Sequence, residues 1–152
     1  MTKPISTPSV ALLQRGLEYW QRKRGHRRMP ARRDIDPIEI PDLLPNIVLV
    51  DVERDPYDFR YRLIGTAITA HLARDYTGTC FSSLPHQQPG SRVWETGVRI
   101  VAEKEPIFSD IPYVGPDRWV RGYGDLYMPL SENDDDVNMI FGVVQFETGL
   151  QD

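Results

Sequence analysis

The sequence predicts an α+β domain in which an N-terminal helix precedes two strands, two helices and three further strands. Three observations support this order. Apolar residues recur at helical spacing over residues 8–24 and again over 90–103. Strand-like runs separated by turn residues occupy 46–64 and 106–148. One domain is expected because 152 residues, 40% of them hydrophobic, suffice for a single buried core.

The first predicted helix covers residues 8–24. Thr7 is a typical helix cap, Pro8 is favourable in the first turn, and Gly25 is a typical stop. The apolar side chains form one stripe, made of Val10, Leu13, Leu17 and Trp20. Such a stripe needs a surface to cover, so we expect it to pack on a sheet of its own chain or of a second copy in a homodimer.

Residues 25–45 are expected to be mostly irregular because they contain four prolines. The charge is uneven along the chain: residues 1–33 hold nine Lys/Arg and one acid, whereas residues 34–152 hold nine Lys/Arg and 21 acids. The basic cluster either folds back on the acidic body or attracts phosphates and acidic protein surfaces. For the second interpretation, the residues that could bind an anion are Arg24, Arg28 and Arg32.

Two strands are expected next. Residues 46–52 are rich in β-branched residues, and Asp55-Pro56 marks a turn. Residues 59–64 alternate, which predicts one face made of Phe59, Tyr61 and Leu63.

The remaining elements are two helices and three strands. Residues 65–78 are expected to form a short helix and residues 90–103 a longer one. The last three strands are expected at 106–114, 118–130 and 138–148, with the acidic stretch 131–136 as the hairpin turn between the final two.

This order of elements resembles that of PAS domains. The stretches "DYTGTCFSSL" and "MPLSENDDDVNMIFGVVQFET" are similar to the central turn and the closing hairpin of the family. The segment from Trp20 to Val52 resembles the opening of stand-alone bacterial PAS proteins. The resemblance implies a PAS fold with a five-stranded antiparallel sheet, short helices on one face and the N-terminal amphipathic helix on the other. It divides the chain into a helix and basic linker (1–45) and a PAS domain (46–150).

The chain's one cysteine, Cys80, lies in the central turn. In the LOV branch of the PAS family a cysteine in this turn attacks flavin, flanked by asparagine and arginine. Here Cys80 comes one residue earlier after Gly78, and both flanking residues are absent. A covalent flavin is therefore not expected. We expect Cys80 to be a packed structural residue, with a redox or adduct role as the alternative.

Haem is not expected either. Haem-binding PAS domains carry their axial histidine on the long helix, and residues 90–103 contain none. The other histidines near the domain centre, His71 and His86, are expected at the surface or as caps. The sequence therefore leaves the cofactor unknown.

Gln145 matches the position at which LOV sensors direct a glutamine toward flavin, so a non-covalent flavin or nucleotide stays an alternative ligand. If Gln145 faces inward, alternation turns Phe141 and Val143 inward as well and places Val144 and Phe146 on the outer face. That outer face is the expected cover site for helix 8–24.

The expected ligand pocket combines polar and aromatic side chains. Its residues are Tyr61, Trp94, Tyr123, Asp125, Tyr127, Phe141 and Gln145. Buried polar groups need partners, so they either satisfy one another or bind a small polar organic ligand.

No enzyme motif occurs in the sequence, and the acidic turn lacks the spacing of a calcium loop, so we expect no catalytic or metal site. Helix, linker and PAS core use all 152 residues. We therefore expect a cytoplasmic sensory or adaptor module in signal transduction that acts in trans on a signalling protein. Its expected partners are a second copy and a small ligand, without membrane insertion and without DNA.

Overall fold

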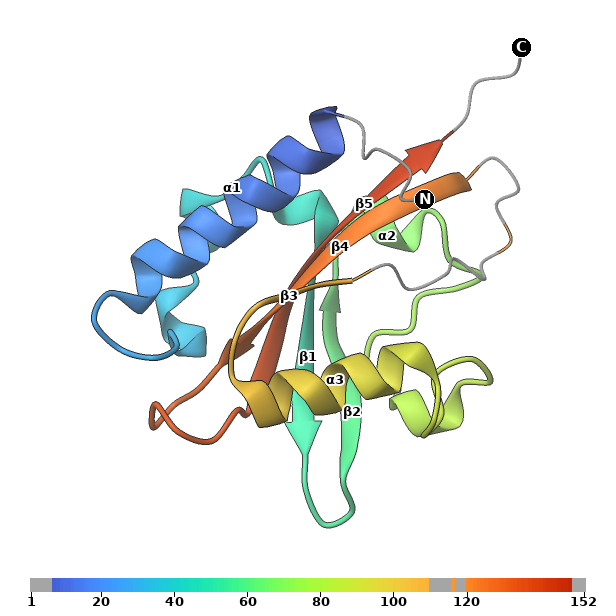
Figure 1. Cartoon of the computed structure of the whole chain (residues 1–152). Helices are drawn as coiled ribbons and strands as arrows, with labels where there is room; N and C mark the ends of the chain where they lie inside the picture. The colour runs from blue at the N-terminus through green and yellow to red at the C-terminus, as the bar shows by residue number, and fades with distance from the viewer. Residues whose placement is uncertain (1–6, 110–115, 117–119, 149–152) are drawn as a thin grey trace, which may run out of the picture.

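The computed structural model describes residues 7–109, 116 and 120–148. One five-stranded antiparallel sheet runs through it, with the strand order β2-β1-β5-β4-β3. The strands are β1 (Ile47–Glu53), β2 (Asp58–Ile64), β3 (Ile107–Ser109), β4 (Val120–Leu130) and β5 (Met139–Thr148). The helices are α1 (Thr7–Arg24), α2 (Thr66–Thr69) and α3 (Arg92–Glu103). The strands pass between α1 and α3 (Figure 1), which confirms the predicted fold class.

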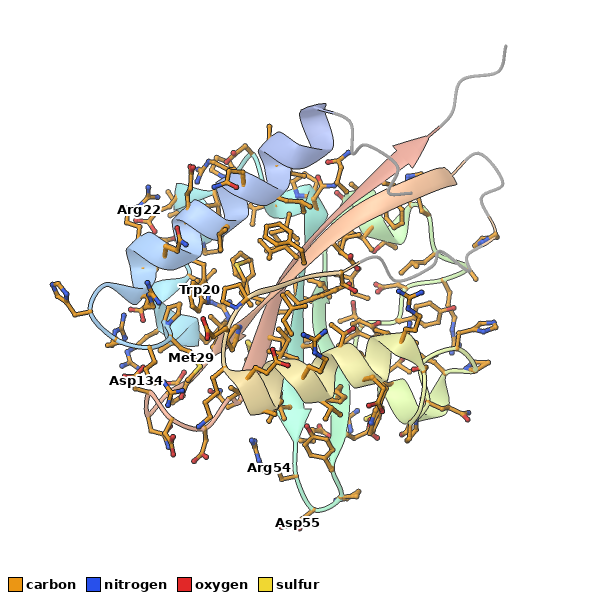
Figure 2. The ribbon with its side chains drawn as sticks, viewed as in Figure 1. Trp20, Arg22, Met29, Arg54, Asp55 and Asp134 are labelled. Carbon is orange, nitrogen blue, oxygen red and sulfur yellow. The ribbon has the colours of Figure 1, made fainter. Side chains whose placement is uncertain are left out.

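Helix α1 covers the outer face of strands β4 and β5. The amphipathic pattern determines which side of the helix is buried: Leu13 and Trp20 are each 2% exposed. Figure 2 shows Trp20 between the helix and the strands and Arg22 on the opposite side. The Trp20 indole N–H also donates a hydrogen bond of 2.9 Å to the carbonyl oxygen of Pro129 on β4. The prediction that this helix covers the sheet is confirmed.

Glycine at position 16 lets α1 approach the sheet closely. A Cβ atom built at Gly16 would lie 2.7 Å from Cγ2 of Val143 and 3.9 Å from the terminal methyl of Met128. Both of these side chains are fully buried. The outer face is therefore packed without room for one more methyl group at this point.

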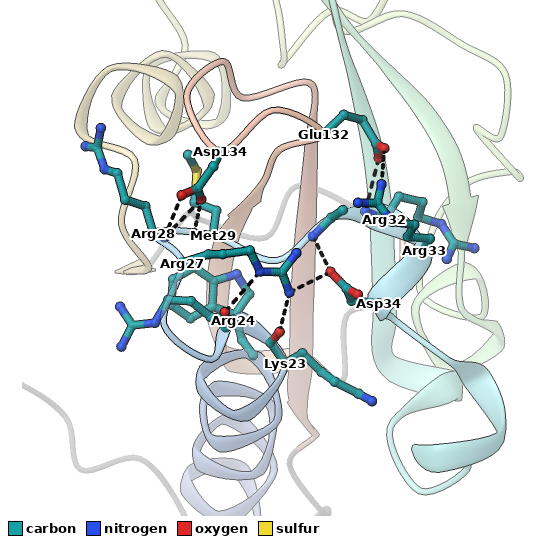
Figure 3. A network of polar contacts seen from close by, with 12 residues as sticks. Lys23, Arg24, Arg27, Arg28, Met29, Arg32, Arg33, Asp34, Glu132 and Asp134 are labelled. Carbon is teal, nitrogen blue, oxygen red and sulfur yellow. Dashed lines mark hydrogen bonds and ion pairs between the residues drawn. The ribbon is translucent and has the colours of Figure 1, made fainter.

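The linker between α1 and β1 folds back on the β4–β5 hairpin (Figure 3). Asp134 accepts hydrogen bonds from the backbone N–H groups of Arg28 (2.9 Å) and Met29 (3.0 Å). Arg33 forms an ion pair of 2.8 Å with Glu132. Three short 3-10 helices follow in the otherwise irregular linker: Arg32–Asp34, Pro37–Glu39 and Leu44–Asn46.

The inner face of the sheet is covered by α2, the 3-10 turn Phe81–Ser83 and α3. At the lower part of this face Phe59 is fully buried, with its ring 5.1 Å from Trp94 and 5.3 Å from Phe81. A Cβ atom at Gly97 of α3 would lie 2.8 Å from Cζ of Phe59. This part of the inner face is tightly packed.

Two predicted elements are shorter than expected. Of the helix expected at 65–78, only α2 at Thr66–Thr69 forms. The stretch after it turns because Asp75 accepts hydrogen bonds from the backbone and hydroxyl of Thr77, which competes with helix formation. Of the strand expected at 106–114, β3 takes Ile107–Ser109, and residues 110–114 lie outside the described residues.

The predicted alternation of the second strand is wrong at its end. Residues 61 and 63 pair with Val50 and Leu49, so a bulge adds one residue to β2 there. Beyond the bulge, the side chains of β2 point to the faces opposite to those predicted. Leu63 points outward and is 39% exposed, whereas Ile64 turns to the inner face.

Candidate functional site

A cavity of about 570 Å³ lies between the upper inner face of the sheet and the segments that cross it. The sheet contributes side chains from four strands to its floor: Val48, Val50, Tyr61, Ile64, Tyr127, Val144 and Phe146. Its opposite wall comes from α2, the loops on either side of the 81–83 turn, and the first residues of α3. The other lining residues are Ile68, Leu72, Ala73, Tyr76, Phe81, Leu84, Pro85, His86, Gln87, Arg92, Val93 and Pro116.

The absence of a side chain at Gly142 leaves room for neighbouring side chains on the sheet side of this cavity. A Cβ atom at this position would lie 2.6 Å from Cγ1 of Val48 and 2.7 Å from Cδ1 of Tyr127. With glycine here, the side chains of β1 and β4 meet across β5. Val144 and Phe146, the next residues of β5 on the same face as Gly142, line the cavity.

The wall carries few polar groups. The Tyr61 hydroxyl donates a hydrogen bond of 2.7 Å to Oε1 of Gln87. Burial raises the pKa of Tyr61 well above its usual range, which keeps the hydroxyl protonated even at alkaline pH. Arg92 and His86 both line the cavity and are exposed to solvent, which places these two polar side chains at its rim.

Of the residues predicted from sequence for a pocket, Tyr61 and Tyr127 line this cavity. Trp94 is buried against Phe59 instead. Asp125 is 1% exposed and lies opposite Val144 in the sheet, outside the lining. The side chain of Tyr123 lies outside the described residues. The role of this set in ligand binding stays a prediction.

The predicted facing of β5 is wrong. Val143, which was expected inside, packs under Gly16 of α1, and Phe141 and Gln145 share its face. Val144 and Phe146, which were expected outside, line the cavity. Because both rows of β5 are apolar, the sequence pattern did not determine the facing. The resemblance of Gln145 to the glutamine of LOV sensors led to the wrong set of β5 side chains being assigned to the inner face.

Several lining residues were missed by sequence reasoning. His86 and Gln87 lie in an irregular loop, and Tyr76 lies in the stretch expected to be helical. Arg92 belongs to α3, but periodicity marks only the apolar side of a helix. The one available signal was the aromatic and polar composition of the stretch from Tyr76 to Gln87, which is unusual for a solvated loop.

Cys80 lies on the edge of the sheet rather than in the cavity. It bridges to Arg60 of β2, and its sulfur lies 3.7 Å from a carboxylate oxygen of Glu53. The side chain is half-buried. Burial raises the pKa of the thiol, with the nearby Asp58 adding to the shift. A raised pKa favours the unreactive thiol form.

The arginines predicted to bind anions lie around the linker. The Arg24 guanidinium is 5.3 Å from the Trp20 ring, and an Arg32 side-chain nitrogen donates to the carbonyl of Ile35 at 3.1 Å. The Arg28 side chain extends to solvent (Figure 3). The linker does fold back on the acidic hairpin, as one of the two interpretations expected. Anion binding by these residues stays a prediction.

The stripe predicted as a subunit interface is used within the chain. Leu13 and Trp20 are buried on the outer face and Leu17 is packed against the same core. The side chain of Val10 lies outside the described residues. A role for this stripe between two copies stays a prediction.

Within the described part of the chain, no group of three His, Cys, Asp or Glu side chains is arranged to hold a metal ion. None of the described helices is both long and apolar enough to cross a membrane.

Comparisons with known proteins agree with the fold. No curated protein matches the sequence. Among solved structures, a sensory box sensor histidine kinase from Vibrio cholerae aligns with a TM-score of 0.51 at 14% identity, over 74% of this chain and 90% of that one. The PAS domain of BvgS from Bordetella pertussis aligns with a TM-score of 0.41 at 17% identity, over 75% of this chain and 87% of that one. A family model described as PAS domain matches residues 8–145, from α1 to the middle of β5. The chain therefore belongs to the PAS domain family.

Proposed function

We propose that this chain is a sensory or adaptor module that binds a small organic molecule in the cavity and transmits the signal in trans to another protein. PAS domains are generally sensors in signal transduction and are typically non-enzymatic. The observation that most supports the proposal is the cavity of about 570 Å³. Its volume lies within the ~300–1,000 Å³ range of small-molecule sites.

The contrast with the rest of the interior supports this proposal. Protein interiors are normally close-packed, and an apolar void lowers stability through lost contacts. Two regions are tightly packed, one around Gly16 on the outer face and one around Gly97 on the inner face. A fold that packs so closely elsewhere retains this space at a cost, and ligand binding is the function that such a space serves.

The proposed partners in trans are a signalling protein and a second copy of this chain. PAS domains commonly mediate protein interaction and dimerisation. Helix α1 lies at the surface, with its polar side, which includes Arg22, turned outward (Figure 2). A homodimer with α1 near its interface would place that helix between the sheet of one copy and the other copy.

A non-covalent flavin or nucleotide is the alternative ligand. It is favoured by the five aromatic side chains of the lining, on which a flat ring system can stack: Tyr61, Tyr76, Phe81, Tyr127 and Phe146. A purified protein that is yellow and releases flavin on denaturation would support this alternative.

The test is native mass spectrometry and thermal unfolding on freshly purified protein and on a Val144→Phe variant, in which the larger side chain occupies the cavity. We expect a small molecule, retained or added, to bind the unmodified protein and not the variant. A compound that binds both proteins equally, or a broad set of neutral, acidic and basic aromatic compounds that stabilises neither, would contradict ligand binding in the cavity. The same spectra report whether the protein is a dimer.

A further inference from the structure

Most of the cavity lining is apolar. Of its 19 residues, 13 have purely apolar side chains and three more are tyrosines. None of the described lining residues is an Asp or a Glu. A positively charged group is costly to bury without a carboxylate beside it. The composition of the lining therefore disfavours a cationic ligand.

The Arg and His side chains of the lining lie at its rim. Arg92 and His86 are both exposed to solvent. Water weakens the attraction that an exposed side chain exerts on an anion, whereas moving a carboxylate or phosphate into an apolar interior has a large desolvation cost. These two side chains therefore compensate little for the burial of an anionic group, and the cavity favours an uncharged ligand.

Aromatic rings line the cavity on two sides and are themselves held in place. They come from the sheet (Tyr61, Phe146) and from the facing loops (Tyr76, Phe81). The rings of Tyr61 and Phe81 pack 4.8 Å apart, and the ring of Phe146 packs 4.6 Å from that of His71. Rings that are already fixed by neighbours offer a surface to a ligand ring at little entropic cost. This arrangement favours a rigid ring system over a flexible chain.

The hydrogen-bonding capacity of Gln87 is only partly used. The Tyr61 hydroxyl donates a hydrogen bond of 2.7 Å to its Oε1 atom. The amide nitrogen of this half-buried side chain carries two N–H donors and has no hydrogen-bond partner among the described residues. Tyrosine hydroxyls donate or accept, so they favour neither kind of ligand group. The Gln87 amide therefore favours a ligand with an acceptor such as a carbonyl oxygen.

From these observations we propose that the cavity binds an uncharged aromatic ring compound with a hydrogen-bond acceptor, such as an aryl ketone or lactone, and that Gln87 recognises the acceptor. This inference rests on the proposed function, since it names the class of ligand for the same site. The sequence predicted a more polar ligand because of Asp125 and Gln145, and neither of them is among the described lining residues.

Four probes with one ring skeleton test the charge preference by calorimetry on the full chain: 1-tetralone, tetralin, 1-aminotetralin and tetralin-1-carboxylate. The first two are uncharged, whereas the amine and the acid carry opposite charges at neutral pH. We expect both uncharged probes to bind more tightly than both charged ones. The ketone 2-octanone, which has no ring, is expected to bind more weakly than 1-tetralone.

A Gln87→Leu variant tests the acceptor contact. It removes the amide and keeps a side chain of similar size in the wall. We expect it to weaken 1-tetralone about tenfold, the size of one lost hydrogen bond, and to leave tetralin, which has no acceptor, nearly unchanged. Gln88→Leu is the matched control, because Gln88 is exposed and is not among the lining residues. It is expected to leave the binding of all probes unchanged.

The outcomes separate this inference from the proposed function. Equal or tighter binding of the amine or the acid overturns the preference for an uncharged ligand while ligand binding stands. Equal losses for 1-tetralone and tetralin in Gln87→Leu, or no loss for either, overturn the role of Gln87. Tighter binding of 2-octanone overturns the preference for a ring, and failure of all these probes overturns the inference. If they bind Val144→Phe as well as the unmodified chain, the site is not the cavity, and the proposed function fails with it.

Discussion

The two faces of the sheet are built from neighbouring residues but packed in opposite ways. On β5, Val143 is fully buried beneath Gly16 of α1, and no methyl group could be added between them. The next residue, Val144, turns to the other face and borders a cavity of about 570 Å³. One peptide bond therefore separates a closely packed part of the molecule from an open one.

The difference indicates that the two faces of the sheet have different roles. The outer face provides stability, since burial of Leu13, Trp20 and the β4 side chains removes a large apolar surface from water. The inner face gives up part of that stability around the cavity. Because the outer face and the Phe59–Trp94 cluster hold the sheet, the cavity can stay open without loss of the fold.

The largest expected effect is on the outer face. Trp20→Ala removes a ring that is 2% exposed together with its hydrogen bond to Pro129, and is expected to lower the free energy of unfolding by about 3–5 kcal/mol. Urea denaturation measures the change. Trp20→Phe is the control that keeps most of the ring packing and loses the hydrogen bond, so its effect is expected to be clearly smaller. A loss below about 1 kcal/mol for Trp20→Ala would show that α1 is loosely attached.

The close contact at Gly16 can be tested next. Gly16→Ala places a methyl group 2.7 Å from Val143 and is expected to cost about 1–3 kcal/mol, although alanine favours the helix itself. Adding Val143→Ala in the double variant should cost less than the sum of the two single changes, because it makes room for the new methyl group. Gln14→Ala, at an exposed position of the same helix, serves as control. A Gly16→Ala protein that is more stable than the original contradicts the contact.

The helix, and its packing on the sheet, could be predicted from sequence because an amphipathic helix is a local pattern. Leu13, Leu17 and Trp20 recur at helical spacing whatever the rest of the chain does. The facing of β5 could not be predicted in this way, since Phe141 and Val143 are as apolar as Val144 and Phe146. Only the register with β1 and the position of α1 determine which row faces the cavity.

The site was less predictable than the fold for the same reason. Tyr61 could be placed because it alternates in a strand, but the β2 bulge that brings Ile64 inside has no clear sequence signal. His86, Gln87 and Arg92 meet the sheet only through tertiary contacts of an irregular loop and a helix end. Periodicity describes regular elements, and eight of the 19 residues that line this cavity lie outside them.

A smaller effect is expected where the linker meets the hairpin. Asp134→Asn keeps a residue type that tolerates the positive φ of 64° but removes the charge that accepts two backbone N–H groups. We expect a loss of about 1 kcal/mol in the free energy of unfolding, smaller at high salt. Asp136→Asn, in the same loop but bonded locally to Asn133, is the matched control. Equal effects of the two changes would contradict the linker contact.

The smallest expected effect is a pH dependence at Tyr19. Burial raises the pKa of this phenol from 10.0 to about 12, with Glu39, which accepts its proton at 2.7 Å, adding to the shift. Between these values the unfolded chain releases the proton while the folded chain retains it, so stability falls as the pH rises from 10 toward 12. The Tyr19→Phe variant has no phenol to titrate. The difference in free energy of unfolding between the variant and the unmodified protein should therefore shift in favour of the variant over this pH range. A constant difference between the two proteins would contradict the shifted pKa.

One pair of variants tests the contrast between the two faces most directly. Val143→Phe and Val144→Phe make the same substitution at adjacent residues, one under α1 and one on the cavity. By urea denaturation, Val143→Phe is expected to lose about 1–3 kcal/mol or more through overpacking, whereas Val144→Phe should change by less than about 1 kcal/mol because its ring enters empty space. Equal losses in the two variants, or a larger loss for Val144→Phe, would contradict a packed outer face and an open inner one.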